Sequence, residues 1–313
     1  MKKMFVVASL ACLMSTSAMA ENVGVSMALF DDNFLTVLRN GMTDYAGTLD
    51  GVTLQVEDAQ NDVAKQLDQI NNFIASGVDA IVVNPVDTSA TQAMSDAAAA
   101  AGIPLVYVNR QPVNVDTLPD NQAFVASNEV ESGTLETQEV CRLLTAAGKT
   151  EANILVMMGE LSNQAAVQRT ADIHDVIATP ECSFMKIVEE QTANWSRTEA
   201  TDLMTNWLSA GLQFDAVVAN NDEMAIGAIQ ALKAAGTDMA VMIVGGVDAT
   251  QDALAAMQAG DLDVTVFQDA AGQGQGAIDA ALKLAKGEAV DQKVYIPFQL
   301  VTPANVADFA AKN

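Results

Sequence analysis

The stretch Gly77-Val78-Asp79-Ala80-Ile81-Val82-Val83-Asn84-Pro85 contains the pattern that decides the fold. A glycine that ends a helical segment comes first, a short continuous apolar run follows, and the run ends at a polar side chain. Apolar runs of this kind, bounded by turn signals and separated by helical patterns, are typical of buried parallel strands in α/β folds. Asn84 then lies at the carboxyl end of a strand, where α/β folds bind their ligands.

The same pattern occurs seven times along the chain, and each run ends near a carboxylate, an amide or an arginine. The runs are Val23–Leu29 before Asp31-Asp32, Ala80–Val83 before Asn84, Leu105–Val108 before Asn109-Arg110, Ile154–Met158 before Glu160, Ala216–Ala219 before Asn220-Asn221, Val241–Val247 before Asp248, and Val264–Phe267 before Gln268. These side chains suit the binding of hydroxyl groups. The sequence therefore predicts a polar binding cleft.

Helical patterns alternate with these runs, as expected for doubly wound sheets in which each crossover covers one face. The expected helices are Thr36–Ala46, Ala64–Ala75, Ser89–Ala101, Thr134–Ala147, Ala165–Ile177, Thr198–Ala210, Ala225–Ala235, Ala253–Ala259 and Ala277–Lys286. About 290 residues remain after the first twenty, which is more than one ordinary domain. No low-complexity linker divides the chain, so we expect two lobes between which the backbone crosses more than once.

The first twenty residues have the features of a secretory signal peptide. Lys2 and Lys3 precede the apolar stretch Phe5–Met14, and the small-residue tripeptide Ala18-Met19-Ala20 predicts cleavage before Glu21. A transmembrane anchor is the alternative, but the apolar stretch is far shorter than the roughly 20 residues that span a bilayer. We therefore expect an exported, periplasmic protein.

The strong negative charge excludes one class of partner. The formal charge of −25 becomes about −27 once Lys2 and Lys3 are removed, and this charge repels phosphate groups. We expect no nucleic-acid partner. Only Cys141 and Cys182 remain in the mature chain, and the sequence leaves open whether they form a disulfide or two separate buried thiols.

Few residues suggest catalysis or metal binding. His174 is the only histidine, and no Ser/His/Asp arrangement can be assembled. We therefore predict no catalytic residues, no metal and no cofactor. Asp32 and Asp248 could serve as the acid and base of a glycosidase, but accepting hydrogen bonds from ligand hydroxyls needs no further machinery.

Several motifs together resemble the periplasmic sugar-binding proteins of the ribose and galactose/glucose type. They are Val56-Glu57-Asp58-Ala59-Gln60-Asn61-Asp62, Lys65-Gln66, Gln69-Ile70, the Gly77–Pro85 stretch, Asp31-Asp32-Asn33-Phe34, and Ala219-Asn220-Asn221-Asp222-Glu223-Met224-Ala225. The resemblance covers nearly the whole mature chain. It implies an α/β fold of type I: two doubly wound parallel-sheet lobes, a hinge with three crossings, a ligand between the lobes and delivery to a membrane ABC permease.

Applied residue by residue, the resemblance predicts the ligand site and the limits of the lobes. The N-terminal lobe would comprise 21–126 plus 270–297, and the C-terminal lobe 127–269 plus 298–313. Phe34 and Trp195 would cover the apolar faces of a sugar ring. The predicted ligand-binding residues are Asp32, Phe34, Asn84, Asn109 and Arg110 from the first lobe, and Asn163, Arg169, Trp195, Asn221, Asp248 and Gln268 from the second lobe and the hinge.

Two departures from the galactose/glucose type bear on the ligand. Asn163 and Ala165 stand where that type has a histidine and an aspartate, and the calcium-binding loop is missing because Ala146–Ala152 has one carboxylate, Glu151. Arg110 and Arg169 resemble the arginine pair of ribose binders. Together with Asn194-Trp195-Ser196-Arg197, the set most resembles inositol-type members, including those that take methylated inosamines.

The sequence therefore predicts an exported, monomeric solute-binding protein, not an enzyme, that captures a cyclic polyol and delivers it to an ABC importer. Myo-inositol or a related cyclitol comes before galactose, glucose and ribose, and a chemoreceptor is a further candidate partner. An exported glycoside-acting enzyme is a distant alternative. A sugar-sensing transcription regulator would need a basic helix-turn-helix where the signal peptide stands.

Overall fold

The first lobe is organised around strands that are buried on every residue. In the computed structural model, which describes residues 20–312, β3 (Ala80–Val83), β4 (Leu105–Val108) and β5 (Gln122–Ala126) have no exposed position. With β1 (Glu21–Met27), β2 (Val52–Asp58) and β11 (Lys293–Tyr295) they form a parallel sheet in the order β11-β5-β4-β3-β1-β2. The predicted signal peptide, except for Ala20, lies outside the described residues.

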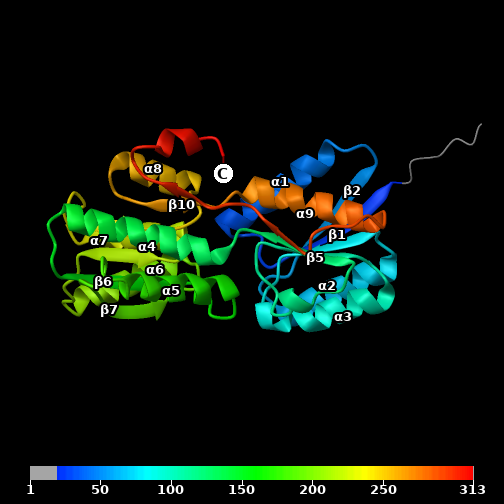
Figure 1. The fold of residues 1–313 in the computed structure, drawn as a ribbon, viewed down its shortest axis with the longest axis horizontal. Helices are drawn as coiled ribbons and strands as arrows, with labels where there is room; N and C mark the ends of the chain where they lie inside the picture. Colours follow the sequence, from blue (N-terminus) through cyan, green and yellow to red (C-terminus); the bar gives the residue numbers. More distant parts are fainter. Residues whose placement is uncertain (1–19, 313) are drawn as a thin grey trace, which may run out of the picture.

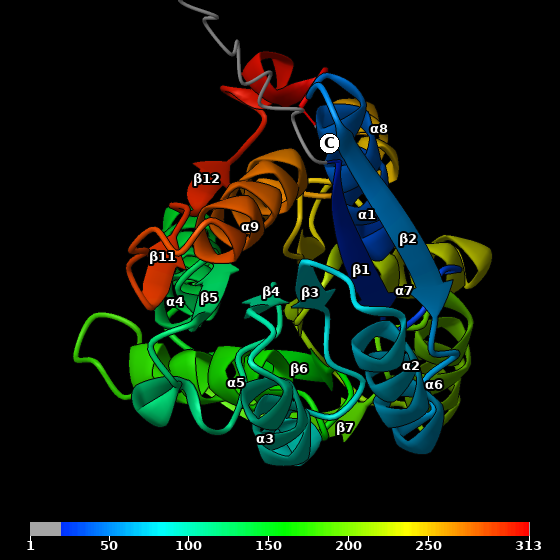
Figure 2. The ribbon, with the colours of Figure 1, turned by 90° about the vertical axis from the view of Figure 1, so that its right-hand side faces the viewer.

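Helices cover both faces of this sheet (Figures 1 and 2). Apolar residues of α1 (Asn33–Gly47) and α9 (Ala270–Ala285) pack on one face, and those of α2 (Val63–Ser76) and α3 (Thr91–Ala101) pack on the other. This arrangement explains why the central strands are apolar throughout, since neither face meets water. The strand order reverses between β1 and β3, which is where doubly wound folds bind ligands.

The second lobe repeats the plan with fewer strands. Its parallel sheet has the order β7-β6-β8-β9, formed by β7 (Met185–Thr192), β6 (Ala152–Met158), β8 (Ala216–Ala219) and β9 (Ile243–Gly245). Next to it, β10 (Thr265–Phe267) pairs antiparallel with β12 (Gln299–Val301).

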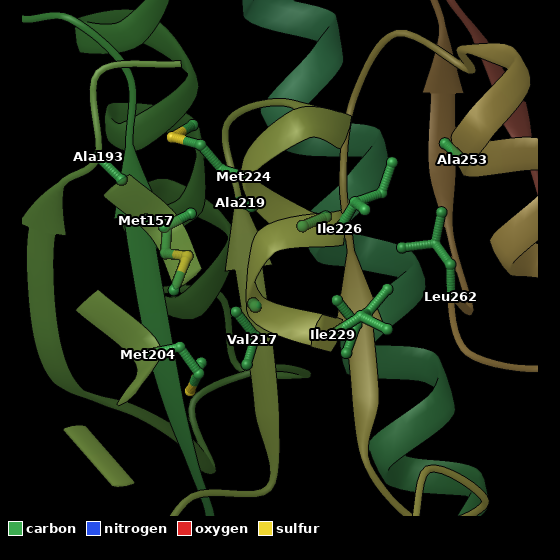
Figure 3. Close-up of a cluster of buried hydrophobic side chains, with 14 of the residues drawn as sticks. Met157, Ala193, Met204, Val217, Ala219, Met224, Ile226, Ile229, Ala253 and Leu262 are labelled. Carbon is green, nitrogen blue, oxygen red and sulfur yellow. The ribbon is translucent and has the colours of Figure 1, made fainter. Parts of the chain in front are cut away.

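Five α-helices and the 3-10 helix Val306–Phe309 complete the second lobe among the described residues. Residues of α4 (Glu129–Ala146) and α5 (Gln164–Ile177) pack in one apolar cluster. Those of α6 (Arg197–Ser209), α7 (Asp222–Ala234) and α8 (Gln251–Ala259) pack in a second cluster, shown close up in Figure 3 around Met157, Val217 and Met224. The fold class predicted from the sequence is confirmed.

The chain crosses between the lobes three times. The crossings are the short segments 127–128 between β5 and α4, 268–269 between β10 and α9, and 296–298 between β11 and β12. The strands and helices on either side of each crossing pack in different lobes. Three adjacent short connections form a hinge, which allows the lobes to move relative to one another as units.

Cys141 and Cys182 form a disulfide, with their Cα atoms 5.7 Å apart. The bond joins α4 to the segment that follows α5, and it decides between the two alternatives that the sequence left open. No helix within residues 20–312 combines the length and the apolar character needed to cross a membrane.

Candidate functional site

A cavity between the two lobes collects the polar residues that end the strands. Both lobes contribute to its lining, and its empty space of about 380 Å³ is partly open to solvent. Of the eleven predicted ligand-binding residues, ten line it: Asp32, Phe34, Asn109, Arg110, Asn163, Arg169, Trp195, Asn221, Asp248 and Gln268. Leu35, Glu129 and Ala165 complete the lining and were not among the predicted residues.

Three of the polar residues are held in place as helix N-caps. The side chain of Asp32 accepts a hydrogen bond from the Leu35 amide at 2.7 Å at the start of α1. Asn163 and Asn221 cap α5 and α7 in the same way. The positive ends of three helix dipoles therefore point toward the cavity, and the capping side chains are fixed before any ligand arrives.

Backbone strain is concentrated at the cavity. Asn109, Trp195 and Asp248 have φ angles of 66°, 62° and 125°, which lie in a region that residues other than glycine rarely adopt. Asp248 is held there because its amide donates to the Val266 carbonyl at 2.8 Å. Strained residues that the surrounding structure enforces are typical of binding sites.

Arg169 is bound to protein groups on most sides. It is 4% exposed, its Nε and Nη2 donate to the two carboxylate oxygens of Glu129 at 2.8 and 3.1 Å, and its Nη1 donates to the Asn220 carbonyl at 2.7 Å. Asp248 lies 3.8 Å from Nη1. Burial alone would lower the pKa of Arg169, but Glu129 and the other nearby carboxylates raise it. Glu129 occupies the guanidinium fork of Arg169, so the prediction that Arg169 binds the ligand rests on its place in the cavity lining.

Arg110 has more donors directed at the cavity. Among the described residues, only its Nη1 donates to protein, to the carbonyls of Pro85 and Val86 at 3.0 and 3.4 Å. Burial lowers the pKa of Arg110, and Glu160 and Asp32 oppose this shift. Its remaining N–H groups can serve a ligand.

The carboxyl groups of the site are strongly affected by burial. Desolvation raises the pKa of Asp248 well above its usual range, and the nearby Arg169 only partly opposes the shift. Desolvation also raises the pKa of Asp32, against the Leu35 amide and Arg110. Behind the cavity wall, burial raises the pKa of Asp222 to about 7.

Asn84 does not line the cavity. Its Oδ1 accepts from the Ala28 amide at 3.3 Å, and its Nδ2 donates to Asn109 Oδ1 at 3.2 Å and to the Val108 carbonyl. Its position is one layer behind the wall, where it orients Asn109.

The two aromatic residues of the site come from different lobes. Phe34 lies in the first turn of α1, and Trp195 lies in the loop between β7 and α6. The indole of Trp195 packs directly on Gly159, where an added Cβ would lie 2.2 Å from Cζ2. The guanidinium of Arg169 lies 5.6 Å from the centre of the indole ring and steadies it further.

The lobes touch across the mouth of the cavity. Asn33 donates to Glu223 at 2.6 Å, and Asn61 donates to Glu160 at 3.0 Å. On another edge, the amide of Thr88 donates to the Ser162 carbonyl at 3.1 Å. The structure is thus a closed form, with contacts between the lobes outside the hinge.

Glu129 is the main residue of the site that sequence reasoning missed. It follows the first hinge crossing and begins α4, where an acidic residue is expected simply for helix stability. Nothing in the sequence joins it to Arg169, forty positions later. Within residues 20–312, no three His, Cys, Asp or Glu side chains gather in a way that could hold a metal ion.

Comparison with known proteins places the chain among binding proteins. A family model for the periplasmic binding protein domain matches residues 23–289. A protein of Rhizobium meliloti, provisionally named as rhizopine-binding, is 69% identical over 313 residues and covers both chains fully. The ribose import binding protein of Bacillus subtilis is 30% identical over 282 residues, which are 90% of this chain and 87% of that protein.

Two solved structures with bound myo-inositol have the same fold. One is an ABC transporter solute-binding protein from Bacillus halodurans, with a TM-score of 0.88 and 42% identity, covering 96% of this chain and 100% of that one. The other is the myo-inositol binding protein of Caulobacter, with a TM-score of 0.83 and 28% identity, covering 93% and 96%.

Proposed function

The chain belongs to the periplasmic binding protein family, and we propose that it is the exported receptor of an ABC importer for a cyclitol, with myo-inositol or a related cyclitol as its ligand. The family consists of transport receptors that bind small sugars and are not enzymes. The lobe limits of 21–126 plus 270–297 and 127–269 plus 298–313, the cleavage before Glu21, the periplasmic location and the monomeric state belong to the same proposal.

The composition of the cavity wall carries this proposal. Myo-inositol has a hydroxyl on every ring carbon, and each hydroxyl that is buried without a partner costs about 1–3 kcal/mol. The wall offers the amides of Asn109, Asn163 and Asn221, the donors of Arg110 and the acceptor of Asp32. Donors and acceptors on all sides suit a ring with hydroxyls all round.

The aromatic residues suit the faces of the ring. Phe34 and Trp195 enter the cavity from opposite lobes, so closure of the lobes brings both onto one ligand. The C–H groups of a cyclitol ring form two weakly polar faces, which pack favourably on aromatic rings. The relatives with bound myo-inositol and the relative named for rhizopine support the same ligand class.

Galactose, glucose or ribose is the alternative ligand of the same class. Asn163 and Ala165 both line the cavity, so the departure from the galactose/glucose type lies at the ligand itself. Because relatives are named for ribose binding, ribose is the better supported of these alternative ligands.

A thermal-shift screen of cyclitols, hexoses and pentoses tests the proposal. A ligand at one hundred times its dissociation constant stabilises the folded state by about 2.7 kcal/mol, which is easily measured as a rise in the melting temperature. We expect a rise with myo-inositol or another cyclitol, and recovery of the ligand unchanged after incubation. A rise with ribose or galactose alone would reject the cyclitol, and conversion of the ligand would favour the enzyme alternative.

A further inference from the structure

A run of four buried polar side chains connects the cavity wall to the hinge. Asn84 Nδ2 donates to Asn109 Oδ1 at 3.2 Å, and Asn109 Nδ2 donates to Gln273 Oε1 at 3.3 Å. Gln273 Nε2 then donates to Ser127 Oγ at 3.0 Å. We call these four residues the amide relay. They come from four separate segments of the chain: the ends of β3, β4 and β5 and the start of α9.

The backbone fixes the direction in which the amide relay runs. Asn84 Oδ1 accepts from the Ala28 amide at 3.3 Å, and Asn84 Nδ2 also donates to the Val108 carbonyl at 3.3 Å. A backbone N–H can only donate and a carbonyl can only accept, so the Asn84 amide has one orientation. Asn109 and Gln273 must each turn an oxygen toward the preceding N–H group. The orientation of Asn109 is therefore decided by protein groups before a ligand arrives.

Asn109 keeps one donor and one acceptor for the cavity. A side-chain amide has two N–H groups and an oxygen with two lone pairs. Within residues 20–312, one N–H of Asn109 is used by Gln273 and one lone pair by Asn84. The remaining donor and acceptor suit the hydroxyl of a sugar or cyclitol, which can both donate and accept.

Gln273 joins the amide relay to two crossings of the hinge. Its backbone N–H donates to the Asp269 carbonyl at 2.9 Å, in the crossing 268–269. Its side chain bonds to Ser127, in the crossing 127–128. Gln273 is 0% exposed and lies in the first turn of α9. One buried residue therefore contacts the cavity wall and two of the three crossings.

We infer that Gln273 is a positioning residue for ligand binding: it holds the amide of Asn109 in one orientation and ties that amide, through Ser127, to the first hinge crossing. The inference rests on the proposed function in so far as a small polyol occupies the cavity. Gln273 is not among the residues that line the cavity, so it acts through Asn109. An amide without this restraint would have to be ordered by the ligand, and ordering a side chain on binding lowers affinity.

A double-mutant cycle on ligand affinity tests the inference. Gln273→Met keeps the length of the side chain and removes both of its hydrogen-bonding groups. Calorimetry uses myo-inositol, or whichever of ribose, galactose and glucose binds if the thermal-shift screen rejects the cyclitols. We expect Gln273→Met to lower affinity about fivefold or more in the wild type, but about twofold or less in Asn109→Ala, where no amide remains to be positioned.

Gln275→Met is the matched control. It is the same substitution at an exposed position of α9, and it should leave affinity unchanged. Ser127→Ala is a smaller change that removes only the acceptor of Gln273 Nε2. It should lower affinity about twofold to fivefold in the wild type and have no further effect in Gln273→Met. Urea unfolding checks that every variant folds, and Ser127→Ala takes the place of Gln273→Met in the cycle with Asn109→Ala if Gln273→Met does not.

The outcomes separate this inference from the proposed function. If Gln273→Met lowers affinity by the same factor with and without Asn109→Ala, or not at all, Gln273 does not position Asn109 and the inference is wrong while the proposed function stands. If Ser127→Ala lowers affinity equally in the wild type and in Gln273→Met, the tie to the hinge is wrong. If none of the screened ligands binds, the proposed function fails and the inference fails with it.

Discussion

Arg110 and Arg169 have different tasks at the residue scale, although the sequence predicts the same role for both. Arg169 is held by Glu129, Asn220 and Gln268, whereas Arg110 keeps donors directed at the cavity. We therefore expect Arg169 to support the cavity wall and Arg110 to contact the ligand.

Substitution of each arginine checks this division. Arg110→Ala should lower ligand affinity by about 1.5–3 kcal/mol, the usual value of hydrogen bonds to a charged group, and Arg110→Lys should not restore it. Arg169→Ala should lower not only ligand affinity but also the free energy of unfolding, the latter by about 3–5 kcal/mol, because it leaves Glu129 buried without its partner. Calorimetry and urea unfolding separate the two quantities. Equal losses of stability in both alanine variants would contradict the division.

Asp222 makes stability depend on pH. Its pKa rises from 3.8 to about 7 on folding, so the folded state binds the proton more tightly than the unfolded state. The stabilisation that this proton gives is fully present below the unfolded-state pKa of 3.8. It is lost as the pH rises through the folded-state pKa of about 7. Urea unfolding at several pH values should therefore show wild-type stability falling over this range more steeply than that of Asp222→Asn. Parallel curves for the two proteins would show that Asp222 does not titrate in this way.

Most of the predicted ligand-binding residues line the cavity, but the protein groups that they contact were not predictable. Strand ends can be recognised from apolar runs, and this is why Asp32, Asn109 and Asp248 were identified. The roles depend on pairings between distant residues, such as that of Arg169 with Glu129. Asn84 was placed on the wall because it ends a strand, but its amide bonds to Asn109 instead.

At the scale of elements, most buried strands were predicted, but the buried strand β5 and the edge strands β2 and β7 were not. β2 has no buried position and β7 has one, Met185, and neither strand contains a continuous apolar run. α9 begins at Ala270, seven residues before the predicted start at Ala277, because Gly272, Gly274 and Gly276 weaken the helical pattern. Gly274 packs so close to α1 that an added Cβ would lie 3.0 Å from the Leu38 carbonyl oxygen.

The loop after β6 positions Trp195, and a single methyl group tests this. In Gly159→Ala the new Cβ would overlap the indole, so the ring must move away from its position in the cavity wall. We expect the free energy of unfolding to fall by about 1–3 kcal/mol, the usual cost of overpacking, and ligand affinity to fall because the indole no longer lies in the wall. Gly47→Ala is the control, because nothing lies within 4 Å of its added Cβ. Unchanged ligand affinity in Gly159→Ala would show that the position of Trp195 does not matter for binding.

The disulfide between α4 and the segment after α5 should stabilise the second lobe. It closes a loop with a sequence separation of 41, and loops of this size give about 2–4 kcal/mol. Urea unfolding of the wild type should shift by this amount when a reductant is added, and the variant with both Cys141→Ser and Cys182→Ser should show no shift. If the reductant does not shift the urea unfolding of the wild type, the disulfide does not stabilise the lobe.

At the scale of the whole molecule, the closed form is held by few contacts. Outside the hinge, the polar contacts between the described parts of the lobes are those of Asn33 with Glu223 and Asn61 with Glu160 at the mouth, and of Thr88 with Ser162 and Gln164 at another edge. The two contacts at the mouth are exposed and contribute little, since water competes for the same groups. A ligand that bridges both walls supplies the missing stabilisation, so we expect the lobes to open when the cavity holds only water.

Small-angle X-ray scattering with and without ligand tests most directly that a cyclitol is captured between two closing lobes. The radius of gyration should fall when myo-inositol or the best cyclitol of the screen is added to saturation, and it should stay unchanged with the same concentration of glucose, galactose or ribose. An unchanged radius of gyration at saturating cyclitol, or contraction with ribose or a hexose alone, would show that the lobes do not close on a cyclitol.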